Sequence, residues 1–166
     1  MITLNEVPDG IEEIIDAYGN PDSNGDFLLD TSWVDHNLAV FDLPFPMRLS
    51  WAPLRIARRF QAHKTVGLVM VDALREIRDY KGWQYLQDND YDFYGGCFNF
   101  RLMRGINKLS AHAWGIAFDI NPHLGPLGEP SYQPEFVVQA FARRRFVWGG
   151  EWARPDGMHF QACKGI

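Results

Sequence analysis

Residues 116–121 alternate between bulky apolar side chains and small or polar ones. Ile116, Phe118 and Ile120 occupy the even-numbered positions, whereas Asp119 occupies an odd-numbered one. This period of two is typical of a strand with one face in a hydrophobic core. If Phe118 and Ile120 face the core, Asp119 faces a cleft on the other side of the strand.

Helical periodicity surrounds this strand. Apolar residues between positions 66 and 77 form a stripe that predicts a helix from about His63 to Tyr80. A short amphipathic helix is predicted over 11–18, and another is predicted to begin with Pro134 as its first residue and to have Arg143–Arg145 in its last turn. Residues 31–54 show little period, so we expect loops and short strands there. Strands are also expected at 146–148 and 158–161. These elements predict an α+β fold, with helices packed on a small, mainly antiparallel sheet.

Length and charge restrict the class of protein. The 166 residues suit one core, so we expect residues 1–166 to form a single domain and the protein to be a monomer. The formal net charge of −5 argues against a nucleic-acid partner. The basic cluster Arg55, Arg58 and Arg59 is interpreted as a solvated helix face. No apolar run approaches the ~18 residues that favour a membrane span.

The cysteines and the N-terminus give two further expectations. Cys97 and Cys163 are too few for a disulfide framework, and we interpret them as free buried thiols. The first residues contain neither a basic segment nor a long apolar one, so we expect no secretion signal and synthesis in the cytoplasm.

Four polar side chains have a spacing that suits a metal site with an adjacent base. His112 precedes Asp119 by seven residues, and Asp156 precedes His159 by three. The apolar neighbours of His159 pack one way, so its imidazole points the other way. Two imidazoles and one carboxylate can hold zinc as three ligands and leave a fourth position for water. Asp156 could take a proton from that water and return it to a leaving amine.

Other side chains could complete such a site. Arg101 and Arg104 lie just before the His112 segment, and a guanidinium there could hold a developing oxyanion or a substrate carboxylate. Trp114, Trp148 and Trp152 could line a groove or pack in the core. His36, His63 and His123 match no motif, and we interpret them as structural or exposed.

Together these residues resemble a known family, the M15 zinc peptidases. The resemblance rests on Ser110-x-His112-x-x-Gly115-x-Ala117-x-Asp119 followed by Asp156-x-x-His159. It extends to Gly95–Arg101 and to Phe146–Trp152, and it covers about residues 63–161. The family includes D-alanyl-D-alanine carboxypeptidases and dipeptidases, and phage endolysins that are L-alanyl-D-glutamate endopeptidases.

The resemblance implies a set of roles. Zinc would be held by His112, Asp119 and His159 in a cleft at the sheet, and Asp156 would be the general base and acid. Arg101 matches the substrate-holding position of the family, with Arg104 as a competitor. The substrate would be a peptide of bacterial peptidoglycan.

Three functions stay open at this point. Asp156 resembles the endopeptidase branch, because carboxypeptidase members usually have Glu at that position. The alternatives are a D-alanyl-D-alanine carboxypeptidase and a zinc-bearing wall-binding domain without turnover. An endolysin without a secretion signal would reach the wall by a phage-type or holin-like release.

Overall fold

The structure is a computed structural model that describes residues 1–166, and it has the expected α+β class. Its helices are α1 (Ile11–Tyr18), α2 (Thr31–Asn37), α3 (Gly67–Lys81), α4 (Trp83–Asp88) and α5 (Glu135–Ala142). Its strands are β1 (Leu38–Leu49), β2 (Ala52–His63), β3 (Phe93–Gly96), β4 (Ala117–Ile120), β5 (Val147–Trp148) and β6 (His159–Gln161). Three short 3-10 helices complete the elements: η1 (Ala111–Trp114), η2 (Pro122–Leu124) and η3 (Gly149–Glu151).

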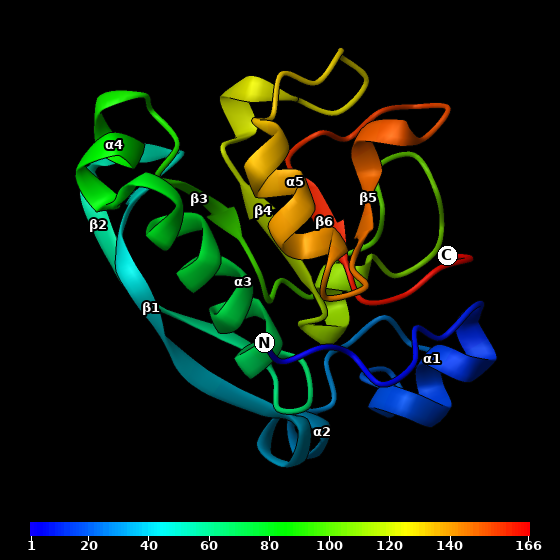
Figure 1. Ribbon diagram of the computed structural model, residues 1–166. Helices are drawn as coiled ribbons and strands as arrows, with labels where there is room; N and C mark the ends of the chain where they lie inside the picture. Colours follow the sequence, from blue (N-terminus) through cyan, green and yellow to red (C-terminus); the bar gives the residue numbers. More distant parts are fainter.

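The six strands form one mixed sheet in the order β2-β1-β3-β4-β6-β5. Neighbouring strands are antiparallel except for β1 and β3, which are parallel. The expectation of a mainly antiparallel sheet is therefore confirmed. Figure 1 shows α3 and α5 side by side across one face of this sheet, where α3 contacts both β1 and α5.

The prediction for residues 31–54 was wrong. This segment contains α2 and most of a long hairpin in which β1 and β2 each span 12 residues. Pro44 and Pro46 obscured the strand pattern, because proline cannot donate to a strand ladder. The pairing of β1 with β2 shifts register between Asp42 and Met47, which is where both prolines lie. An irregularity in the ladder thus accommodates residues that normally argue against a strand.

The basic cluster also lies on a different element than expected. Arg55, Arg58 and Arg59 are exposed on β2, the strand at one edge of the sheet, and not on a helix. Charged side chains on an edge strand discourage other chains from pairing with it. The cluster therefore has a structural explanation that requires no acidic partner.

The helical stripe of residues 66–77 is confirmed. In α3, Met70, Leu74 and Ile77 are fully buried and belong to the main hydrophobic cluster. Full burial of such a side chain contributes about 1.5–3 kcal/mol to the free energy of unfolding. None of the helices is both long and apolar enough to cross a membrane.

The alternation in β4 is confirmed as well. Phe118 and Ile120 are fully buried, and the Phe118 ring lies 6.1 Å from the ring of Phe141 in α5. Phe118 therefore faces the helices. Because successive side chains of a strand point to opposite faces, Asp119 lies on the face away from α5. This arrangement directs one carboxylate away from the core.

The end of α5 differs from the prediction. The helix stops at Ala142, so Arg143–Arg145 follow it and do not form its last turn. Arg144 is buried, and its guanidinium pairs with Asp72 and Glu76 of α3. Arg144 therefore links the end of α5 to α3 by ion pairs, which differs from the expected interaction with the helix dipole.

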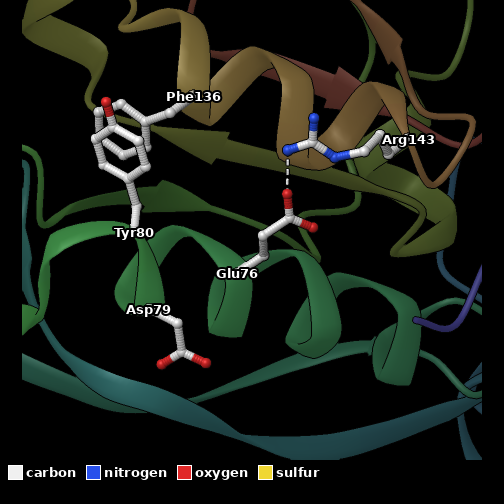
Figure 2. A pocket seen from close by; sticks show the side chains of 5 residues that line it. All are labelled: Glu76, Asp79, Tyr80, Phe136 and Arg143. Carbon is white, nitrogen blue, oxygen red and sulfur yellow. Dashed lines mark hydrogen bonds and ion pairs between the residues drawn. The ribbon is translucent and has the colours of Figure 1, made fainter.

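A pocket lies between α3 and α5, and Figure 2 shows the side chains that line it: Glu76, Asp79, Tyr80, Phe136 and Arg143. The Tyr80 and Phe136 rings stack with their centroids 4.3 Å apart, and Arg143 pairs with Glu76. These contacts join the two helices. The pocket is in the helical layer, on the opposite side of the sheet from Asp119.

His63, at the end of β2, is a buried structural histidine. Its Nε2 lies 3.2 Å from the Tyr18 carbonyl oxygen and its Nδ1 lies 2.8 Å from Thr65 Oγ1, so a neutral ring has a partner at each nitrogen. Its ring also packs against those of Tyr18 and Trp33. Burial lowers the pKa of His63 to about 4; the hydrogen bond to Tyr18 opposes this shift, and the charge of nearby Lys64 adds to it.

The stability of the fold should therefore decrease in mild acid. An unfolded histidine takes up a proton near pH 6.5, whereas folded His63 stays neutral down to about pH 4. Between these values the unfolded state binds more protons, so stability falls as the pH falls. We expect a loss of about 2 kcal/mol between pH 7 and pH 5. Urea unfolding should show this loss in the wild-type protein and a smaller one in His63→Gln; equal losses in both would contradict the assignment.

Candidate metal centre

His112, Asp119 and His159 converge at one place on the sheet. One potential ligand atom from each lies within 4.8 Å of the others. Asp119 and His159 are direct cross-strand partners in β4 and β6, and His112 belongs to η1. The backbone register thus sets the positions of two members, and the turn before β4 sets that of the third.

The turn that carries His112 is determined by the residues at its two ends. The Ser110 hydroxyl accepts a hydrogen bond from the His112 backbone N–H at the start of η1. Gly115 ends it with φ of 66°, a conformation that favours glycine. Gly95 of β3 provides space beside the site, because a Cβ there would lie 2.7 Å from the Asp119 Cβ. The glycines quoted in the family pattern therefore have a steric role in the turn and the strand.

The His112 ring has one satisfied nitrogen and one that faces the other ligands. Its Nδ1–H donates to the Cys97 carbonyl oxygen at 2.6 Å. This bond leaves Nε2 as the nitrogen with a free lone pair. Nε2 is buried without a hydrogen-bond partner and lies 3.2 Å from Asp119 Oδ2.

The His159 ring presents its other nitrogen to the same carboxylate. Its Nδ1 lies 2.9 Å from Asp119 Oδ1, and its Nε2 lies 2.9 Å from Gln161 Oε1. The two imidazole rings are 5.0 Å apart at 68°. The carboxylate of Asp119 therefore lies between the two imidazoles, with one oxygen towards each.

The charges in this group are strongly coupled. Burial alone would raise the pKa of Asp119, but the charges of His112 and His159 and the hydrogen bond of His159 lower it far below its usual value. Burial alone would lower the pKa of His159, yet the hydrogen bond and charge of Asp119, with the Gln161 hydrogen bond, raise it. Asp119 is thus held as a carboxylate, the form that a metal requires.

The donor set fits a divalent cation such as zinc. Two imidazole nitrogens and one carboxylate are a known ligand set for catalytic zinc. The Nε2 atom of His112 is the clearest indication, because a buried nitrogen without a partner is costly unless something binds it. His112, Asp119 and His159 are the residues that would hold the ion.

Asp156 lies beside this group. Its backbone carbonyl accepts the His159 N–H at 3.1 Å, and its buried Oδ1 has no hydrogen-bond partner. Burial raises the pKa of Asp156 and the charge of Asp119 adds to the rise, whereas His159, His112 and Arg101 oppose it. A carboxyl group with a raised pKa is better suited to exchange a proton near neutral pH.

The two arginines differ in their surroundings. Arg101 is half-buried, donates to the Leu102 carbonyl at 3.2 Å, and lies close enough to Asp156 for its charge to lower the pKa of that group. Arg104 is exposed, and its side chain makes no hydrogen bond or ion pair. Arg101 is therefore the better placed of the two, and a substrate-binding role for either stays a prediction.

Replacement of each arginine with alanine should show which of the two contributes to catalysis. A hydrogen bond to a charged group contributes about 1.5–3 kcal/mol, so Arg101→Ala should lower kcat/KM by about 10- to 100-fold. Arg104→Ala should leave it close to the wild-type value. Kinetics on a soluble stem peptide would measure both. A larger loss for Arg104→Ala would reverse the assignment.

The three tryptophans have different positions. Trp114 is buried and donates its indole N–H to the Gly19 carbonyl, so it belongs to the core. Trp148 is half-buried. Trp152 is 38% exposed, and its ring lies 5.5 Å from that of His159. Of the three, Trp152 is the one placed to contact a substrate beside the metal group.

Sequence reasoning missed two partners of the histidines. The backbone carbonyl of Cys97 has no sequence signature, because any residue could supply it. Gln161 could have been found, since it shares a strand face with His159 two residues earlier and is the one polar side chain after it in β6. Cys97 and Cys163 are free and buried, as expected.

Comparison with known proteins agrees with this centre. A family model described as D-alanyl-D-alanine carboxypeptidase matches residues 104–162. Comparisons with curated proteins and with solved structures give no match. The matched segment contains all three candidate ligands and Asp156, but it begins after Arg101. The match over residues 104–162 supports an M15-family peptidase that acts on peptidoglycan in general.

Proposed function

We propose that this protein is a zinc-dependent endopeptidase of the endolysin type, which cleaves the L-alanyl-D-glutamate bond of peptidoglycan stem peptides. The observation that carries the proposal is the half-buried carboxylate of Asp156, whose buried Oδ1 has no hydrogen-bond partner, beside the His112, Asp119 and His159 group. An aspartate at this position resembles the endopeptidase branch of the family. Release from the cell by a phage-type or holin-like route is part of the proposal.

The residues of the chain suggest how such a bond would be hydrolysed. Zinc bound at the three ligands would polarise the scissile carbonyl and lower the pKa of a water molecule. Asp156 accepts a proton from that water as its oxygen forms a bond to the carbonyl carbon. The same carboxyl then donates the proton to the amine nitrogen as the C–N bond breaks. Arg101 holds an anionic group of the substrate.

A D-alanyl-D-alanine carboxypeptidase is the second candidate. The description of the matching family model favours it directly. Its site would require the same three ligands and the same proton transfer, and it would differ in where the substrate ends. A zinc-bearing domain without turnover is the third candidate, and the buried Oδ1 of Asp156 argues against it because a site without chemistry gains nothing from that cost.

Mass spectrometry of digested peptidoglycan separates these three candidates. An endopeptidase should release fragments with new amino termini at D-glutamate, and a chelator should abolish them. Release of free D-alanine alone would select the carboxypeptidase. A zinc-loaded protein that releases neither product would support the binding domain. Replacement of the chelated metal with zinc should restore the original products.

A further inference from the structure

Gln161 connects His159 to the backbone beyond β6. Its Oε1 lies 2.9 Å from His159 Nε2, and its Nε2 donates to the Cys163 carbonyl oxygen at 3.0 Å. Both Gln161 and His159 are buried, with 5% and 6% exposure. These hydrogen bonds are therefore shielded from competing water.

The chemistry of the carbonyl determines the direction of both bonds. A carbonyl oxygen can only accept, so the Gln161 amide must turn its NH2 group towards Cys163. Its Oε1 then faces His159 and can only accept, which requires the hydrogen of the neutral imidazole to be on Nε2. Nδ1 donates to Asp119 Oδ1 at 2.9 Å while the ring is protonated, and it is the nitrogen that loses its hydrogen when the ring becomes neutral or binds a metal.

The carbonyl of Cys163 is itself held in place. The N–H of Ala162 donates to the Ile116 carbonyl at 2.9 Å, and the N–H of Lys164 donates to the Pro8 carbonyl at 2.8 Å. Backbone bonds therefore hold the chain on both sides of Cys163. The orientation of the Gln161 amide thus depends on the fold and not on a mobile side chain.

The sheet leaves room for this glutamine. Ala117 of β4 is the cross-strand partner of Gln161, just as Asp119 is the partner of His159. Directly opposed side chains in antiparallel strands lie about 4.5–5.5 Å apart at Cβ, so a small residue opposite a long one gives space for the amide. Ala117 is fully buried, as a packed contact would require.

His112 shows the same principle with the opposite nitrogen. There the Cys97 carbonyl accepts directly from Nδ1–H, and Nε2 is left for the metal group. The Nε2 atom of His159 makes no hydrogen bond to a backbone carbonyl. The Gln161 amide lies between this nitrogen and the Cys163 carbonyl and bonds to both. A backbone carbonyl thus determines which ring nitrogen carries the hydrogen in each histidine, directly in His112 and through the Gln161 amide in His159.

We propose that Gln161 is a positioning residue that holds His159 in the Nε2–H tautomer, so that Nδ1 is available as a metal ligand. This inference rests on the metal site of the proposed function. Outer partners of metal-binding histidines typically change metal affinity by about 10- to 100-fold when they are replaced. We expect a loss of that size for zinc in Gln161→Met, which keeps the length of the side chain but cannot accept from the imidazole.

The tautomer can be read without any metal. Long-range proton–nitrogen NMR of the metal-free, full-length protein, at an alkaline pH where His159 is neutral, should show its hydrogen on Nε2. In Gln161→Met the hydrogen should shift at least partly to Nδ1. Zinc affinity would be measured separately, by competition with a chromophoric chelator.

Two variants distinguish positioning from a general loss of packing. Gln161→Glu keeps an acceptor for His159 but loses the donor to Cys163, so it should be less stable yet bind zinc about as well as the wild type. Gln133→Met is the matched control, because buried Gln133 also donates to a backbone carbonyl, that of Ile120, but contacts no histidine ligand. It should lose stability and keep the tautomer of His159.

The outcomes are decisive in both directions. An Nδ1–H tautomer in the wild-type protein would overturn the proposal, as would wild-type zinc affinity in Gln161→Met. If that variant does not fold, a tenfold loss of zinc affinity in Gln161→Glu would overturn it. A wild-type protein that shows the Nε2–H tautomer but binds no zinc would instead contradict the proposed function.

Discussion

Replacement of Asp156 with asparagine should lower kcat by about 10²–10⁴-fold, the usual contribution of a positioned general acid or base. The amide has nearly the shape of the carboxylate but cannot accept a proton from water and pass it to the leaving amine. Because Asp156 is not a member of the ligand group, bound zinc should stay close to one equivalent. Turnover of a stem peptide and metal analysis of the same sample would measure both quantities.

Asp92 provides a matched control for this substitution. Asp92 is buried and, like Asp156, has a carboxylate oxygen without a hydrogen-bond partner, but it pairs with Arg48 at the far end of β3. Asp92→Asn should therefore reduce the free energy of unfolding and leave kcat close to the wild-type value. An Asp156→Asn variant that keeps full activity would remove the general base from the mechanism.

Zinc should stabilise the folded protein, and replacement of Asp119 with alanine should abolish the effect. A ligand that binds only the folded state at a concentration 100 times its Kd adds about 2.7 kcal/mol to the free energy of unfolding. Asp119 supplies the carboxylate between His112 and His159, so its loss leaves two imidazoles that cannot hold the ion at the same place. Asp119→Ala should also have no detectable peptidase activity.

Urea unfolding with and without zinc would test this expectation. The wild-type midpoint should rise with zinc and return after treatment with a chelator, whereas the Asp119→Ala midpoint should not respond. Asp35, an exposed aspartate of α2, supplies the control, because Asp35→Ala should respond as the wild type does. A zinc-dependent rise that survives in Asp119→Ala would place the metal elsewhere.

The parts of the fold that could be predicted are those in which one face is buried and the other is not. The stripe in α3 and the alternation around Asp119 both follow from such a difference, and both were confirmed. The β1–β2 hairpin could not be predicted, because much of β2 is exposed on both faces and has no apolar period. Pro44 and Pro46 further concealed β1, since the irregular register that tolerates them is a property of the pairing.

The candidate site shows the same division. Motif spacing predicted His112, Asp119, Asp156 and His159 as candidate residues, because their residue types already limit the chemistry. The tautomers of the two imidazoles depend on carbonyl groups, which every residue has, so a sequence gives no sign of them. The resemblance already preferred Arg101 to Arg104, and the structure adds that the charge of Arg101 lies close enough to Asp156 to lower its pKa.

The pairing of Asp119 with His159 also determines where the chain can tolerate changes in length. Segments between β4 and β6 connect the two strands without setting their register, so insertions there can alter substrate contacts and leave both ligands in place. One residue inserted within β4 would turn Asp119 towards α5 and expose its apolar neighbours, because side chains alternate between the faces. The loops of this fold can therefore change in length, whereas the few paired residues of β4 and β6 cannot.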